Sequence, residues 1–325
     1  MNRVLVLPIL VFILSWSGLA SATEVPGPLV ETDWLDKHQG DVVMLDVRKD
    51  TKSFTREPVF RKDKKTGKQL LVGVGGHIPG AVLVNYKHVR SKREINGQLV
   101  TRIVPLQADF EKLMQNSGVS KDSAIVIVSK GEGTGDLTMA TRLYWTLKYF
   151  GHDNMAILNG GMAQWTVDGR KVETRPGKTA EGNWQAGAVR DAILASTSEV
   201  SAAVKEGSSQ LVDNRSVSQY FGTGKKSYVH AKGHIPGARM FPNELMNSAG
   251  APAKFLPKED LDKLVRAMDI NRDAETITYC NSGHLASGGW FIMSELLGNK
   301  NASLYDGSMH EWTLNKQPVN AMTME

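Results

Sequence analysis

Cys280 is the only cysteine of the 325 residues, and its surroundings suit nucleophilic chemistry. The thiolate form of cysteine is the nucleophile, and the backbone N–H groups of a tight turn can stabilise it. Such a turn is indicated by the small and polar residues that follow: Asn281, Ser282, Gly283, His284 and Leu285. The alternative interpretation is a buried structural cysteine, which is a common fate of a free thiol.

The elements on either side of Cys280 would place it where a strand meets a helix. Residues 275–279 are a β-branched and aromatic run that is typical of a strand. Residues 286–297 carry apolar side chains at helical spacing, and Gly298 is expected to end this helix. The positive end of the helix would add to the stabilisation of a thiolate. A strand, a turn and a helix around one thiol favour the reactive role over the structural one.

The second half of the sequence repeats the first. Residues 233–238 copy residues 76–81 letter for letter, as Gly-His-Ile-Pro-Gly-Ala. An Asp-x-Arg pattern at the end of a strand also returns, at residues 46–48 and at residues 213–215. A six-residue identity, with further segments in the same order, predicts two copies of one domain.

Strand and helix patterns alternate in both halves, which predicts an α/β fold with a mostly parallel central sheet, flanked by helices, in each domain. We expect the first domain at residues 28–173 and the second, catalytic domain at residues 189–320. A polar stretch with proline and glycine, residues 174–188, is the expected linker. The lysine-rich residues 49–68 are expected to form a solvated insertion loop.

Residues 1–22 have the pattern of a secretory signal peptide. Arg3 precedes an apolar segment that is short for a membrane span, and cleavage is expected after Ala22. An uncleaved N-terminal anchor is the alternative. We therefore expect a periplasmic or secreted protein without a membrane segment after cleavage. The net charge of +5 is too small to predict nucleic-acid binding.

In these motifs the chain resembles the rhodanese family of sulfurtransferases in its two-domain form. The resemblance covers residues 28–320 and rests on Asp-x-Arg, Gly-His-Ile-Pro-Gly-Ala, Cys-x-x-Gly-x-x-Ala and a closing Asp-Gly or Gly-Gly before a tryptophan. It implies that Cys280 accepts a sulfane sulfur as a persulfide, and that the first domain lacks the cysteine. It also implies a small anionic donor such as thiosulfate, and an acceptor that is cyanide or a thiol, including a protein thiol.

The residues around Cys280 would bind the donor and the transferred sulfur. The N–H groups of residues 281–285 would hold the outer persulfide sulfur in the manner of an oxyanion hole. Arg215 matches the position of a donor-binding arginine in relatives, and a guanidinium suits an oxyanion. A salt bridge to Asp213 is the alternative role. For His284, contact with the donor, stabilisation of the thiolate and a structural role all stay open.

The sequence does not identify the donor cleanly. Relatives that prefer thiosulfate carry basic residues directly after the cysteine, where this chain has Asn281 and Ser282. Relatives that prefer mercaptopyruvate carry a second arginine downstream of Asp-x-Arg, where Gln219 stands here. The loss of that arginine favours thiosulfate over mercaptopyruvate.

Other classes of function are excluded or stay as alternatives. A Cys-x5-Arg phosphatase needs arginine at position 286, which is Ala286. One cysteine and eight scattered histidines show no metal-ligand spacing, so neither a metal nor another cofactor is expected. A non-enzymatic carrier that stores sulfur or selenium on Cys280 for a partner protein remains the alternative to a turnover enzyme.

Overall fold

The computed structural model describes residues 23–322, and the predicted signal peptide at residues 1–22 lies outside the described residues. The first half contains a five-stranded parallel sheet with the order β1-β9-β8-β2-β5. Its strands are β1 (Leu29–Val30), β2 (Val43–Arg48), β5 (Val82–Asn85), β8 (Ile125–Val128) and β9 (Met155–Leu158). The central strand β8 is buried along its length, as its four consecutive β-branched residues predict.

The second half repeats this sheet, with the order β10-β14-β13-β11-β12 and all strands parallel. Its strands are β10 (Leu194–Ala195), β11 (Gln210–Asp213), β12 (Arg239–Met240), β13 (Thr276–Tyr279) and β14 (Ala302–Tyr305). The predicted pair of α/β domains with parallel sheets is confirmed.

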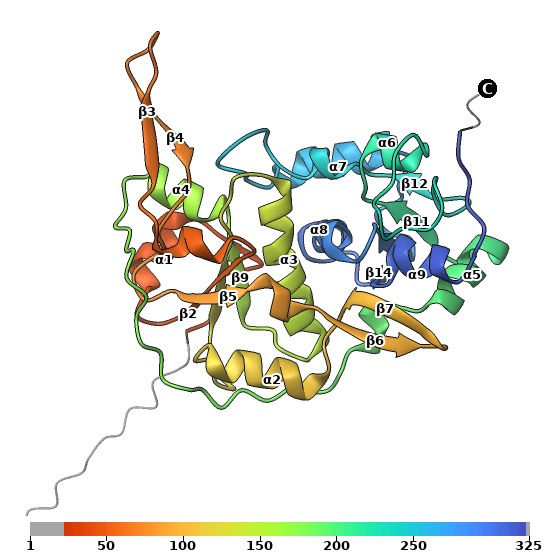
Figure 1. The fold of residues 1–325 in the computed structure, drawn as a ribbon, viewed down its shortest axis with the longest axis horizontal. Helices are drawn as coiled ribbons and strands as arrows, with labels where there is room; N and C mark the ends of the chain where they lie inside the picture. Colours follow the sequence, from red (N-terminus) through yellow and green to blue (C-terminus); the bar gives the residue numbers. More distant parts are fainter. Residues whose placement is uncertain (1–22, 323–325) are drawn as a thin grey trace, which may run out of the picture.

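The helices cover the faces of both sheets, and two of them meet between the halves (Figure 1). The first half holds α1 (Thr32–His38), α2 (Gln107–Asn116), α3 (Thr134–Tyr149) and α4 (Gly161–Val167). The second half holds α5 (Thr197–Glu206), α6 (Val217–Tyr220), α7 (Lys258–Ala267), α8 (His284–Phe291) and α9 (Ser308–Leu314). Helices α3 and α8 pack against each other across the boundary. Within residues 23–322, no helix has the length and apolar character needed to cross a membrane.

Two antiparallel hairpins extend from the first half. One pairs β3 (Val59–Lys62) with β4 (Gln69–Gly73) and projects away from the body, and the other pairs β6 (Ser91–Ile95) with β7 (Gln98–Ile103) and reaches the second half (Figure 1). The β3–β4 hairpin takes up the second part of residues 49–68, which were expected to form a loop. Both faces of β3 are exposed, so the strand has no buried face that a period of two could reveal.

The repeated Gly-His-Ile-Pro-Gly-Ala segments build the same local structure twice. His77 stacks on Phe54 and His234 stacks on Tyr220, each with ring centroids 3.8 Å apart. Each histidine Nδ1 also lies 2.9 Å from the backbone carbonyl of its stacking partner. Because the pair recurs in a half that has no cysteine, these histidines have structural roles.

Candidate active site

Cys280 directly follows β13, at the carboxyl end of the second sheet, and only 1% of it is exposed. The N–H of Ser282 donates a hydrogen bond to the Cys280 sulfur across 3.4 Å. Gly283 has φ +69°, and a Cβ at this position would collide with Asp306 and Arg142. The turn predicted from the sequence is therefore present, and it leads straight into α8, whose positive end lies at the loop.

Ser308, the first residue of α9, fixes the cysteine loop. Its hydroxyl accepts hydrogen bonds from the N–H groups of Cys280, at 3.0 Å, and Gly283, at 3.1 Å. The same hydroxyl donates to the Tyr305 carbonyl at 2.8 Å. One buried side chain thus satisfies two N–H groups of the loop that would otherwise be left unpaired.

The first half has the corresponding turn without the thiol. The Met162 N–H donates to the Ser129 carbonyl, as the Met309 N–H does to the Cys280 carbonyl. Ser129 therefore occupies the position of Cys280. By the same register Gly161, with φ +55°, corresponds to Ser308, with φ +50°. The first copy therefore has the same backbone turn, with serine in place of the nucleophilic cysteine.

Arg142 reaches the cysteine loop from α3 of the first half. It is fully buried, donates to the Gly283 carbonyl at 3.3 Å, and forms an ion pair with Asp306. Burial alone would lower its pKa, but the adjacent Asp306 carboxylate raises the pKa of Arg142 above its usual value. The role of Arg142 was not predicted from the sequence, although an arginine among the mostly apolar residues 137–147, which have no other charge, is a signal that could have revealed it.

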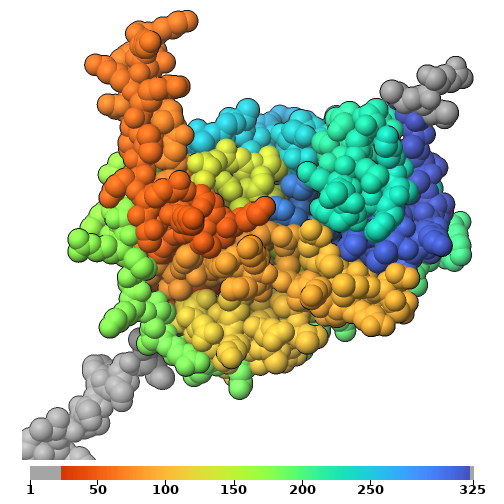
Figure 2. Space-filling view, viewed as in Figure 1, coloured from red at the N-terminus to blue at the C-terminus, as the bar shows by residue number. Residues whose placement is uncertain are grey.

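Cys280 opens on a cavity of about 800 Å³ between the two halves. Figure 2 shows a hollow where orange segments of the first half, teal segments of the second and blue atoms of the C-terminal part meet. Four of the five loop residues that the sequence indicated line the cavity: Asn281, Ser282, His284 and Leu285. The cavity is rich in cations, which favours anionic ligands. Its cationic lining residues are Arg48, Lys49, Arg90, Arg102, Lys130 and Lys226, and its acidic ones are Asp50 and Asp136. Arg48 is paired with Asp46 and Lys130 with Glu132.

The structure does not bring Arg215 into this cavity. Arg215 is 1% exposed, donates to both carboxylate oxygens of Asp213, and donates to the Gly233 carbonyl at 2.8 Å. The expected donor-binding role is therefore unsupported, and the alternative salt bridge is what forms. Gln219, at the position of the second arginine, accepts a hydrogen bond from the Asn281 amide at 2.8 Å.

His284 lies half-buried between the cavity and α3. Its Nε2 donates to the Gly135 carbonyl at 3.1 Å and lies 3.0 Å from the Thr138 hydroxyl oxygen. Burial, with Arg90 and Arg142 nearby, lowers the pKa of His284 to about 3. The imidazole is therefore neutral at neutral pH and provides no positive charge to stabilise a thiolate.

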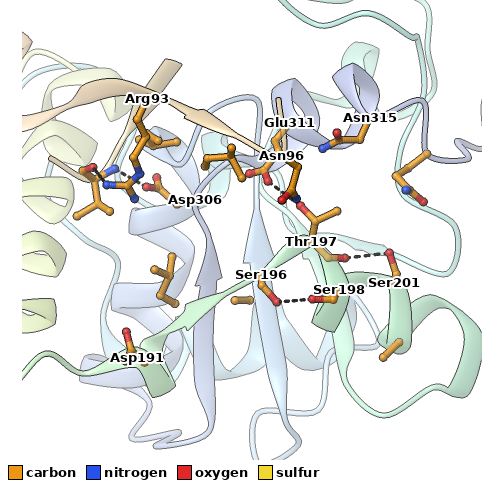
Figure 3. Close-up of a pocket in the computed structure, with 18 of the residues that line it drawn as sticks. Arg93, Asn96, Asp191, Ser196, Thr197, Ser198, Ser201, Asp306, Glu311 and Asn315 are labelled. Atoms are coloured by element: carbon orange, nitrogen blue, oxygen red, sulfur yellow. Dashed lines mark hydrogen bonds between the residues drawn. The ribbon is translucent and has the colours of Figure 1, made fainter. Parts of the chain in front are cut away.

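A second cavity, of about 890 Å³, lies behind the Asp306 turn, against the β6–β7 hairpin (Figure 3). Its labelled side chains include Arg93, Asp306 and Glu311. Cys280 does not line it, so the smaller cavity is the candidate active site. Among residues 23–322, no cluster of three or more His, Cys, Asp or Glu side chains is arranged to hold a metal ion.

Comparison with known proteins gives the same pattern of two copies. Residues 31–168 and 196–315 both match the Rhodanese-like domain. The sulfur carrier protein TtuD of Thermus thermophilus is 30% identical over 299 residues, covering 88% of this chain and 94% of that protein. A "Putative thiosulfate sulfurtransferase" of Mycolicibacterium smegmatis is 29% identical over 294 residues, covering 87% and 94%.

Two solved structures are similar in fold. SseA from Escherichia coli, a 3-mercaptopyruvate sulfotransferase, aligns with a TM-score of 0.68 and 24% identity over 87% of this chain and 98% of that chain. The anaerobic ergothioneine biosynthesis enzyme from Chlorobium limicola aligns with a TM-score of 0.72 and 19% identity, over 91% and 71%. At these identities the similarity supports the fold alone.

Proposed function

This chain belongs to the rhodanese-like family of sulfurtransferases, and on that premise we propose that Cys280 carries the sulfur it transfers. The observation that carries this proposal is the buried Cys280 sulfur, which accepts the Ser282 N–H at 3.4 Å and opens on a cationic cavity. The hydrogen bond and the start of α8 stabilise negative charge on this sulfur.

In the proposed reaction the Cys280 thiolate attacks the outer sulfur of thiosulfate. A bond forms between the two sulfurs, the sulfur–sulfur bond of thiosulfate breaks, and its electron pair leaves with sulfite. The enzyme then holds an anionic persulfide on Cys280. A cyanide ion or a thiolate attacks the outer sulfur of the persulfide and takes it, and the bond pair returns to Cys280 as the thiolate. Neither step needs a metal, a proton or an external oxidant.

A non-turnover carrier is the second candidate, because the relative at 30% identity is a sulfur carrier protein. A carrier would load once from the donor and release its sulfur only to a partner protein. Steady-state formation of thiocyanate from thiosulfate and cyanide separates the two functions. Many turnovers per Cys280 support the enzyme, whereas a single stoichiometric loading with no turnover supports the carrier.

We propose thiosulfate, or another sulfane donor with an anionic end, over mercaptopyruvate. Gln219 occupies the position of the second arginine and is engaged by Asn281, while Arg215 is engaged by Asp213. Neither of these positions therefore offers a free guanidinium to a carboxylate. Measured kcat/KM values for both donors decide the matter, and a clear preference for mercaptopyruvate would contradict the proposal.

We also propose that the protein is exported and acts in the periplasm or outside the cell. The support is the charged, apolar and small-residue pattern of residues 1–22. Sequencing the N-terminus of the exported protein should begin at Thr23. A protein that retains Met1 would contradict cleavage.

A further inference from the structure

Two polar groups of the first half are buried at the Cys280 cavity without a partner. The Tyr86 side chain lines the cavity, the residue is 2% exposed, and its hydroxyl makes no hydrogen bond to any residue within the described range 23–322. The Nε of Arg90, four residues further on, is also buried and lacks a hydrogen-bond partner within that range. A buried donor that has no acceptor is unfavourable, so both groups are available to a ligand.

The surroundings hold these two groups in place while leaving them unbonded. The Arg90 guanidinium lies over the Tyr86 ring, 4.3 Å from its centroid, and the His284 ring lies 5.0 Å from the Tyr86 ring. Burial raises the pKa of Tyr86 to about 12. The hydroxyl therefore keeps its proton at neutral pH, and it can donate to an anion in the cavity.

Arg102 adds a second guanidinium from β7 of the first half. Its backbone has φ +67°, a conformation that L-residues rarely adopt, and its guanidinium lies 3.9 Å from the centroid of the Tyr228 ring. Both arginines line the cavity, and within residues 23–322 neither forms a salt bridge with a carboxylate. Their charge is therefore not neutralised by the protein, as that of Arg215 is.

We infer that Tyr86, Arg90 and Arg102 form the subsite that binds the oxyanion end of the sulfur donor. This inference rests on the proposed transfer through Cys280. The donor class is a sulfane sulfur attached to a sulfonyl group, as in thiosulfate, with its oxygens bound by the first half and its outer sulfur facing Cys280. When the sulfur–sulfur bond breaks, the same three side chains receive the negative charge that develops on sulfite. The first half thus contributes donor recognition, and the second half contributes the nucleophile.

Tyr86→Phe is the sharpest test, because it removes only a hydroxyl that has no hydrogen-bond partner among residues 23–322. The kcat/KM for thiosulfate should fall about tenfold or more, as for loss of a hydrogen bond to a charged group. The midpoint of urea unfolding should stay the same or rise. The rate at which neutral iodoacetamide alkylates Cys280 should stay within about twofold, since that reagent has no oxyanion. Arg102→Gln should also lower kcat/KM for thiosulfate while leaving the alkylation rate within about twofold.

Tyr149→Phe is the matched control, because the Tyr149 hydroxyl bonds Asp191 outside this cavity, and it should leave kcat/KM unchanged. Unchanged thiosulfate use in Tyr86→Phe would overturn the inference. So would an equal loss of thiosulfate use and of alkylation rate, because that pattern indicates a general effect on Cys280. If wild-type protein failed to gain sulfur from thiosulfate at all, the transfer function itself would fail and the inference with it.

Discussion

Arg142, on α3 of the first half, donates a hydrogen bond to the carbonyl of Gly283 in the cysteine loop of the second half, across 3.3 Å. The same guanidinium is paired with Asp306, which also accepts the N–H of Val104. One buried arginine therefore ties the nucleophile's loop, the β14–α9 turn and the first half together. The active site depends on both halves, although only one of them carries the thiol.

Replacing Arg142 should destabilise the protein strongly. Arg142→Met leaves the buried Asp306 carboxylate without its counter-charge, which should lower the free energy of unfolding by about 3–5 kcal/mol. Urea unfolding measures the change. Lys171→Ala, which removes an exposed ion pair with Glu173, is the control and should cost about 1 kcal/mol or less. Equal effects of the two substitutions would contradict the role of Arg142.

The Ser308 hydroxyl should be needed for an ordered cysteine loop. Ser308→Ala leaves the buried N–H groups of Cys280 and Gly283 without an acceptor, at a cost of about 1–3 kcal/mol for each. Ser117→Ala is a matched control, because that buried hydroxyl only donates to the Leu113 carbonyl, which the Ser117 N–H already reaches. Unfolding free energies that fell equally in both variants would contradict this account of Ser308.

His284 should make stability depend on pH in the acidic range. Its pKa is lowered to about 3 in the folded state, from 6.5, so between these values only the unfolded chain binds the proton. Stability should therefore be constant above about pH 6.5 and fall as the pH drops toward 3, by up to about 1.4 kcal/mol per pH unit from this group. His284→Gln should remove that contribution. If the free energies of unfolding of the wild type and of His284→Gln changed equally with pH, this contribution of His284 would be ruled out.

The fold followed from the sequence because its signals are local and occur twice. The identical segments at residues 76–81 and 233–238 produce the same stacked histidine, and the strand before Cys280 leads into the predicted turn and helix. The contacts of Arg142 and Tyr86 with the site were not predictable in this way. Both residues lie in the first half, more than 130 residues from Cys280 along the chain. They reach the site only because the two halves pack together, through α3 on α8 and through the β6–β7 hairpin.

The role of Arg215 could not be predicted from family resemblance alone. Family resemblance suggested a donor-binding arginine, but Asp213, the last residue of β11, lies two residues earlier and binds the guanidinium. Ser308 could have been recognised by aligning the two copies, because Gly307-Ser308 stands where the first copy has Gly160-Gly161. A serine at a position that otherwise takes glycine indicates that its hydroxyl makes needed hydrogen bonds.

The mass of the intact protein after incubation with thiosulfate, without an acceptor, tests the central claim most directly. Cys280 is the only thiol in the chain, so the wild type should gain one sulfur atom and lose it again when cyanide is added. Cys280→Ser should gain none and unfold at nearly the same urea concentration, since the change removes little volume. A wild-type protein that gains no sulfur from thiosulfate, or a Cys280→Ser variant that still transfers it, would contradict sulfur transfer through Cys280.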